Sequence, residues 1–362
     1  MGSLSSRRPS TVAQGVPSSV EGRSPVSGLR SACRAWRDGW KRVLAAPALV
    51  AGVFVMTFVL ALPLAITLRA ELATHLGDSL AAETAATGVN YDWWQEFTAQ
   101  STGLATSFVP SIIGFAAVLD NVSGVLDARA PIAPIGAALA LYLTGWAFLS
   151  GGIVDRYARQ RPTRTHGFFA ASGVYFFRFL RLAAIAGLVY WWLFWYVHPW
   201  LFDEQFVNLT RGLSVERNAF LIRVVFYAFF GALLVATSLV IDYAKVRIVV
   251  EDRRSALGAL SASLRFIRRH GRQVISLYAL NTLTFLSLLA VWALLAPGAG
   301  GAGVSILAGF VIAQLYIVVR LAMKLQFIAS QTALFQANLA HTSYTAAPVP
   351  VWPESPAAEA IR

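Results

Sequence analysis

The residue types that most often carry chemistry are scattered along this chain rather than grouped into a site. Its five histidines lack the i, i+4 spacing that would place two metal ligands on one helix face. The sequence has neither a Gly-x-Ser-x-Gly nucleophile elbow nor a Gly-x-x-x-x-Gly-Lys-Ser/Thr phosphate loop. A single cysteine, Cys33, excludes an intrachain disulfide and a metal site built from several cysteines. We therefore expect no metal, no cofactor and no enzymatic activity.

The most informative polar residues are two aspartates, Asp155 and Asp242, each of which follows a long apolar run and precedes a basic segment. An isolated carboxylate at a membrane border is costly, so we expect each to have a basic partner. The basic segments supply candidate partners, namely Arg178, Arg181, Arg265 and Arg268. Structural ion pairing is the preferred interpretation. A proton or ion relay is the alternative, although a relay normally needs ionisable groups deeper in the bilayer.

Further polar residues lie within the last two apolar runs. Arg320 and Lys324 are four residues apart on one helix face, where they could reach lipid phosphates or pair with the two aspartates. With the other arginines they form a belt suited to anionic headgroups, unless these charges serve only to determine topology. Asn281 and Gln314 are the polar groups nearest the middle of the membrane, and we expect them to form hydrogen bonds between helices.

These residues belong to a chain that is 57% hydrophobic and 13% charged, whereas globular proteins have about 25% charged residues. Although the net charge is +12, this composition indicates a membrane protein rather than a nucleic-acid binder. Crossing a hydrocarbon core takes about 20 helical residues. Six apolar runs approach or exceed that length: 43–68, 131–154, 182–197, 219–241, 274–296 and 304–327. The predicted fold class is therefore an all-α polytopic membrane protein with six transmembrane helices.

The distribution of charge over alternate loops predicts the orientation. Of the 30 Lys and Arg residues, 25 fall on one side of the predicted membrane domain, and that side carries a net charge of +17. The opposite side carries −5. Because cytoplasmic flanks retain positive charge, both termini should be cytoplasmic. The near absence of lysine, with three in the chain, suggests a bacterial source and thus the inner membrane.

The domain organisation follows from composition. Residues 1–28 and 341–362 are rich in Ser, Pro, Gly and Ala, so we expect disordered cytoplasmic tails on either side of a membrane domain at 29–340. The outer loop, about 69–130, contains an apolar segment at 108–119 that is too short to span. That segment could re-enter the membrane, lie along its surface or dock a partner.

Two pairs of landmarks indicate a duplication. Asp155 and Asp242 are 87 residues apart, and so are Arg178 and Arg265, each of which begins an Arg-x-x-Arg motif. An amphipathic stretch precedes each motif, and residues 29–42 could be a third copy. We therefore expect three helical hairpins, each preceded by a cytoplasmic amphipathic elbow helix lying in the membrane interface.

The run from Asp242 to Arg247, followed by the run from Glu251 to Leu257, resembles bacterial six-helix membrane proteins of unknown function. These include the membrane domain that accompanies some glycerophosphodiester phosphodiesterases. The resemblance implies a membrane module without activity, because catalysis there belongs to a separate soluble barrel. Our leading hypothesis is a non-enzymatic inner-membrane protein that organises anionic lipid or a membrane-protein partner. The alternative is a transporter, permease subunit or lipid-translocating protein with a cavity between the hairpins.

Overall fold

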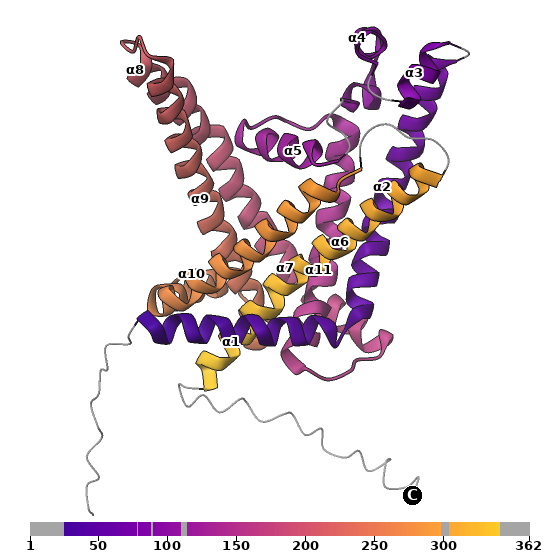
Figure 1. Cartoon of the computed structure of the whole chain (residues 1–362). Helices are drawn as coiled ribbons and strands as arrows, with labels where there is room; N and C mark the ends of the chain where they lie inside the picture. The colour runs from indigo at the N-terminus through magenta and orange to yellow at the C-terminus, as the bar shows by residue number, and fades with distance from the viewer. Residues whose placement is uncertain (1–24, 78, 88–89, 110–113, 298–303, 341–362) are drawn as a thin grey trace, which may run out of the picture.

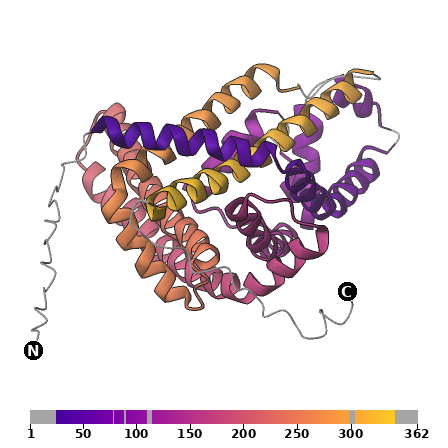
Figure 2. The same ribbon diagram turned by 90° about the horizontal axis from the view of Figure 1, so that it is seen from below.

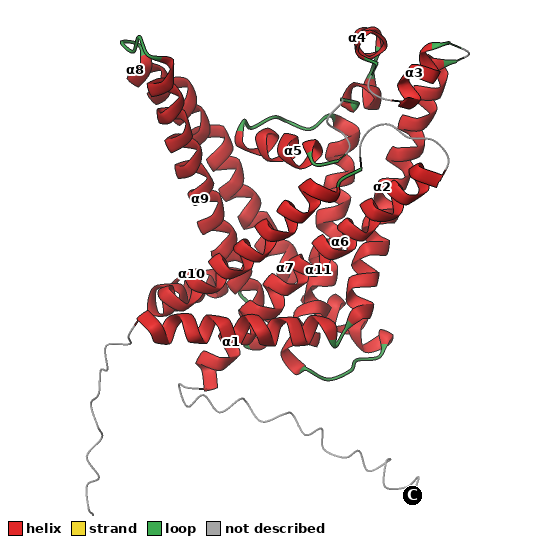
Figure 3. Ribbon diagram, in the orientation of Figure 1, coloured by secondary structure: helices red, strands yellow, loops and turns green. Residues whose placement is uncertain are grey.

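The computed structural model describes residues 25–77, 79–87, 90–109, 114–297 and 304–340, and these ranges contain helices and loops but no β-strand (Figure 3). Six of the helices are long and apolar enough to cross a membrane. The prediction of an all-α chain with six helices of membrane-spanning length and composition is therefore confirmed. Of the two predicted tails, residues 1–24 and 341–362 lie outside the described residues.

The six long helices are α2 (Pro47–Leu76), α6 (Ala133–Arg159), α7 (Thr165–Trp192), α9 (Glu216–Val250), α10 (Ala256–Leu295) and α11 (Val304–Ala340). They are preceded by α1 (Pro25–Leu44), which begins three residues before residue 28, the predicted end of the N-terminal tail. All six are longer than the apolar runs, and in α6, α7, α9 and α10 this is because the neighbouring basic segments are also helical. Past its end at Trp192, α7 continues through two π-helical segments, Leu193–Val197 and Trp200–Gln205, into α8 (Phe206–Thr210).

The helices form an open arrangement with two dissimilar ends (Figures 1 and 2). α1 lies across one end, near the connections 160–164 and 251–255, and we call this the basic end. We call the opposite end the acidic end. There α7 and α9, which together form the α7–α9 arm, lean away from α2 and α6. α10 and α11 run obliquely between them, and α11 crosses α1 at the basic end (Figure 1).

Most of the buried core lies in the half of the molecule nearer the basic end, and a smaller cluster around Phe202 and Phe230 lies in the other half. On α11 the buried side chains begin at Leu321, and on α9 all but Phe230 begin at Leu239. α2 is apolar along most of its length, yet Val53 is its only buried residue. Lipid must therefore cover most of α2 and the acid-end halves of α9 and α11, as expected of helices that are hydrophobic on every side.

The expected elbows take three different forms. α1 is a separate helix, because the chain turns at Ala46 before Pro47 opens α2. α10 has one non-helical residue, His270 (φ −119°, ψ 25°), between its basic first part and its apolar second part. α7 runs from Thr165 to Trp192 as one helix. Moreover, α10 begins 91 residues after α7 rather than 87, so the helix boundaries do not follow the repeat of the sequence landmarks.

The predicted outer loop folds into short helices at the acidic end: α3 (Ala81–Thr87), α4 (Tyr91–Gln100), a 3₁₀ turn (Gly103–Ser107) and α5 (Ala116–Leu126). α5 lies across the neighbouring helices rather than along them (Figure 1). Its C-terminal end is tied to the opposite arm, since Tyr227 donates a hydrogen bond to Asp127 at 2.5 Å and a ring nitrogen of His198 lies 2.9 Å from the Leu126 carbonyl oxygen. The Tyr227 and Ser123 hydroxyls hold the pKa of Asp127 below its usual value. Within the predicted apolar segment, residues 110–113 lie outside the described residues.

Candidate functional site

α1 presents two opposite faces at the basic end. One face is buried and made of small or apolar residues at helical spacing: Gly28, Ala32, Ala35, Gly39 and Val43. The other face is exposed and carries one acidic residue, Asp38, which lies 3.7 Å from Lys41, and four basic residues at helical spacing: Arg30, Arg34, Arg37 and Lys41. We call these four residues the basic stripe. Because the buried face packs on α10 and α11, the bundle fixes the direction in which the stripe points.

The crossing of α1 and α11 is close because Gly39 lacks a side chain. A Cβ atom on Gly39 would lie 2.7 Å from Gln326 Oε1 and 2.9 Å from the Cα atom of Ser330. Gln326 Nε2 donates a hydrogen bond of 2.8 Å to the Trp36 carbonyl oxygen. Gly39 thus allows two helix backbones to meet, and the polar side chains of α11 then bind the backbone of α1.

Arg42, in the last turn of α1, joins three helices. Its Nη1 atom donates to the Tyr157 carbonyl oxygen and to Gln336 Oε1, both at 2.9 Å. Gln336 Nε2 donates in turn to the Ala158 carbonyl oxygen at 2.9 Å. These bonds satisfy carbonyl groups in the last turn of α6 that have no partner within the helix. Burial lowers the pKa of the Arg42 guanidinium, which is nevertheless always protonated in proteins.

The two aspartates do not pair with the predicted arginines. Asp155 is bound by Arg159, four residues further along α6, with 2.8 Å between Oδ1 and Nε. Asp242 is bound by Lys245, three residues further along α9, at 3.0 Å. Both ion pairs are therefore local to one helix. The expectation that these carboxylates connect the elbows to the hairpins is wrong, because a basic residue one turn away on the same helix is already in reach.

The predicted arginines differ from one another in environment. Arg178 forms an ion pair with Asp252 and lies 5.2 Å from the ring centroid of Tyr175. Arg181 donates only to the carbonyl oxygen of Phe177, in its own helix. For Arg265 and Arg268 the described part of the chain shows no ion pair. Arg178 and Arg265 are thus not equivalent, although they are 87 residues apart.

Ion pairs of Glu251 and Asp252 hold the connection 251–255 in place. Glu251, whose side chain is only 11% exposed, lies between Arg247 at 3.4 Å and Arg253. The next residue, Asp252, has a left-handed backbone (φ 49°) and accepts the bond from Arg178 of α7. The connection between α9 and α10 is therefore fixed to α7, which is the kind of tie that we expected from Asp155 and Asp242.

Lys324 of α11 has an aromatic environment instead of an acidic partner. Its Nζ atom donates to the Tyr142 hydroxyl at 3.0 Å and lies 3.7 Å from the ring centroid of Trp146, both on α6. Such a cation–π contact stabilises a desolvated ammonium group. Arg320, one turn earlier, is exposed and forms no ion pair within the described ranges. The two residues therefore share a helix face but not an environment.

Asn281 meets the expectation of an interhelical hydrogen bond. It is fully buried, and its Nδ2 atom donates to Ser330 Oγ of α11 at 2.9 Å. Gln314 is half-buried, and no hydrogen bond from its side chain is described. Of the polar groups near mid-membrane, one therefore binds its neighbouring helix.

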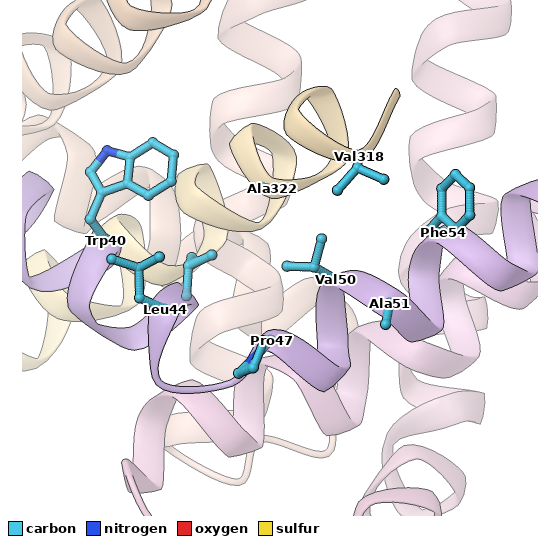
Figure 4. A pocket seen from close by; sticks show the side chains of 9 residues that line it. Trp40, Leu44, Pro47, Val50, Ala51, Phe54, Val318 and Ala322 are labelled. Atoms are coloured by element: carbon cyan, nitrogen blue, oxygen red, sulfur yellow. The ribbon is translucent and has the colours of Figure 1, made fainter. Parts of the chain in front are cut away.

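Two grooves flank the first half of α2. The smaller, about 390 Å³, has only apolar walls, which Trp40 and Leu44 of α1, Val50 and Phe54 of α2 and Val318 of α11 help to form (Figure 4). The larger, about 690 Å³, lies on the other side of α2, between α2, α6 and the start of α7. We call it the α2–α6–α7 groove.

The sequence alone did not reveal Gly39, Gln326 or Gln336 as members of this site. A signal was present in the repetition of small residues at 28, 32, 35 and 39, which is the spacing of a closely packed helix face. In the described ranges no group of three His, Cys, Asp or Glu residues could hold a metal ion.

Comparisons of the chain with family models, with curated proteins and with solved structures give no match. The resemblance to the membrane domain that accompanies some phosphodiesterases therefore stays a prediction.

Proposed function

We propose that this integral membrane protein is non-enzymatic, lies in the inner membrane of a bacterium and binds anionic lipid headgroups through its basic end. One observation carries the proposal, namely that the basic stripe is exposed while the opposite face of α1 is buried in the bundle. A basic residue near an anionic membrane surface contributes about 1 kcal/mol to attraction. A stripe of four therefore supplies a substantial preference for anionic lipid.

The mode of attachment differs from that of a free interfacial helix. A free amphipathic helix places its apolar face among acyl chains. In α1 that face packs on protein, and only flanking residues such as Leu29 and Leu44 are exposed apolar groups. α1 would thus lie at the level of the lipid headgroups, and its packing on the bundle would hold the basic stripe in a fixed orientation. The basic first part of α10, before His270, would lie at the same level as a second elbow.

The same charge distribution supports a cytoplasmic basic end, with the helices forming hairpins that begin and end there. A membrane-protein partner could share this surface, but the stripe itself favours phosphate. We do not propose transport, because Asn281 is bound inside the bundle and neither Asn281 nor Gln314 lines either described groove.

Lipid enrichment in nanodiscs tests the proposal. We would reconstitute the protein in equal phosphatidylglycerol and phosphatidylcholine and measure the lipids retained after mild detergent extraction by mass spectrometry. Changing the basic stripe to glutamine (Arg30→Gln, Arg34→Gln, Arg37→Gln, Lys41→Gln) should reduce the phosphatidylglycerol enrichment at least about tenfold, given about 1 kcal/mol per residue.

The matched control neutralises exposed arginines at the acidic end: Arg69→Gln, Arg211→Gln and Arg217→Gln. It should leave the enrichment unchanged. Equal enrichment in the wild type and the stripe variant would contradict the proposal and leave the stripe with a role in topology alone.

A further inference from the structure

The walls of the α2–α6–α7 groove are suited to a hydrocarbon chain. Its walls are apolar over most of their area, formed by residues from Pro47 to Met56 on α2, from Gly145 to Ile153 on α6, and by Phe168 and Phe169 on α7. The volume of about 690 Å³ is within the usual range for sites that bind one small molecule. An apolar ligand, rather than a polar one, matches these walls.

The length of the groove corresponds to one leaflet. Along α6 it extends from Arg156 to Gly145, which is about 16 Å at 1.5 Å per residue. Half of a hydrocarbon core is about 15 Å. At the far end, the close approach of Met56 to Gly145 narrows the space, since a Cβ atom on Gly145 would lie 2.9 Å from Met56 Sδ. The groove therefore spans the leaflet on the basic side and ends near mid-membrane.

The groove is polar only where it reaches the basic end. Arg156 lines it there, together with Thr163 of the connection 160–164 and Thr165, the first residue of α7. Arg156 Nη2 donates to the Ala45 carbonyl oxygen at 3.3 Å, and among the described residues no carboxylate pairs with Arg156. Its guanidinium has five N–H donors, so donors are left for a further acceptor. An arginine without a carboxylate beside two hydroxyls is suited to a phosphate group.

The smaller groove on the other side of α2 provides an internal comparison. It is bordered by Trp40, Phe54 and other apolar side chains and has no charged residue (Figure 4). Of these two grooves, the α2–α6–α7 groove alone combines a leaflet-long apolar channel with a cation at the headgroup level. The charge of Arg156 and the length of the groove thus both favour the same occupant.

We infer that the α2–α6–α7 groove holds one anionic phospholipid, with an acyl chain between α2 and α6 and the phosphate on Arg156. This site rests on the proposed function in that both concern anionic lipid. It differs from the basic stripe because it is a single enclosed position, whereas the stripe acts on the surrounding headgroups. The lipid would fill the gap between α2 and the start of α7.

Gly52 offers a way to close the groove without disturbing the packing. It lines the groove on α2, and a Cβ atom placed on it would have no heavy atom within 4 Å. Gly52→Leu therefore adds a side chain into open space and also favours the helix. The matched control is Gly187→Leu on α7, where a Cβ atom likewise meets nothing within 4 Å and which does not line the groove.

The experiment counts phospholipids that stay with each variant. Protein from nanodiscs of equal phosphatidylglycerol and phosphatidylcholine is washed in detergent and analysed by native mass spectrometry. The wild type and Gly187→Leu should each keep one phosphatidylglycerol, and Gly52→Leu should lose it. Arg156→Gln should lower the preference for phosphatidylglycerol over phosphatidylcholine about fivefold, while Arg156→Lys, which keeps the charge, should retain most of it.

Retention of the lipid by Gly52→Leu would overturn the inference, and so would occupancy by detergent or by a terminal segment of the chain in place of phospholipid. Failure here is distinguishable from failure of the proposed function. If the groove is empty while the stripe variant still loses enrichment, only the groove assignment is wrong. If Gly52→Leu loses its lipid and the stripe variant is unaffected, the groove stands and the stripe does not.

Discussion

At the scale of single residues, burial is unequally divided between the partners of an ion pair. The side chain of Asp155 is 9% exposed, whereas that of Arg159 is 66% exposed. Removing the arginine would therefore leave a carboxylate buried without a partner, which is more costly than losing the pair as a whole. Asp242 and Lys245 are more evenly exposed, at 22% and 27%, so the same asymmetry is not expected there.

We predict that Arg159→Gln lowers the melting temperature in detergent more than the double variant Asp155→Asn with Arg159→Gln. The single change strands the buried charge, and the double change removes it. Thermal unfolding monitored by fluorescence at neutral pH provides the measurement. Lys245→Gln serves as the comparison and should have a smaller effect. Equal melting temperatures for the single and double variants would show that Asp155 is not held by Arg159.

The sequence made the ion pairing of Asp155 and Asp242 predictable, although the partners were expected on other segments. Their partners lie three or four residues away, and helix geometry alone could have indicated them. The bond between Arg178 and Asp252 could not be predicted in this way, because the two residues are 74 positions apart and meet only when α7 packs against the connection 251–255. Arg42 and Gln336 are further apart still.

At the scale of elements, the docking of α1 depends on its small-residue face. The crossing with α11 has no room for a side chain at Gly39, and polar groups of α11 complete the contact. The apolar runs predicted the six long helices, because length and composition suffice for that. They did not predict that α7 would continue without a break through its basic segment, since basic and apolar residues are equally compatible with a continuous helix.

We predict that Gly39→Leu lowers the stability by about 1–3 kcal/mol through overpacking at this crossing. The leucine would meet the backbone of Ser330, which cannot move independently of α11. Chemical unfolding in mixed micelles would measure the change. Gly231→Leu on α9, where a Cβ atom has open space, is the control and should be neutral. Unchanged stability in Gly39→Leu would mean that α1 is not docked on α11.

At the scale of the whole molecule, the two ends differ in charge and in construction. The basic end contains most of the buried core and the long-range hydrogen bonds of α1. The acidic end consists of diverging helices with short helices on them (Figure 1). This asymmetry agrees with an orientation in which the compact end meets the cytoplasmic headgroups.

We predict that a membrane-impermeant maleimide reaches the acidic end in intact cells but reaches the basic end only after the inner membrane is opened. Thr102→Cys and Arg254→Cys, each in a Cys33→Ser background, place one exposed thiol at the acidic and basic ends. Labelling is read as a mass shift on a gel. Labelling of Arg254→Cys before the membrane is opened would reverse the proposed orientation.

The docking of α1 on α11 also has a consequence for biogenesis. α1 ends at residue 44 and α11 begins at residue 304, so α1 is synthesised long before a helix on which it packs. At ribosomal rates, roughly 15 to 50 s separate their synthesis. During that time the part of the small-residue face of α1 around Gly39, which packs on α11, has no protein to cover it. A ribosome that stalls before α11 would therefore leave a nascent chain in which this part of α1 is still accessible to quality control.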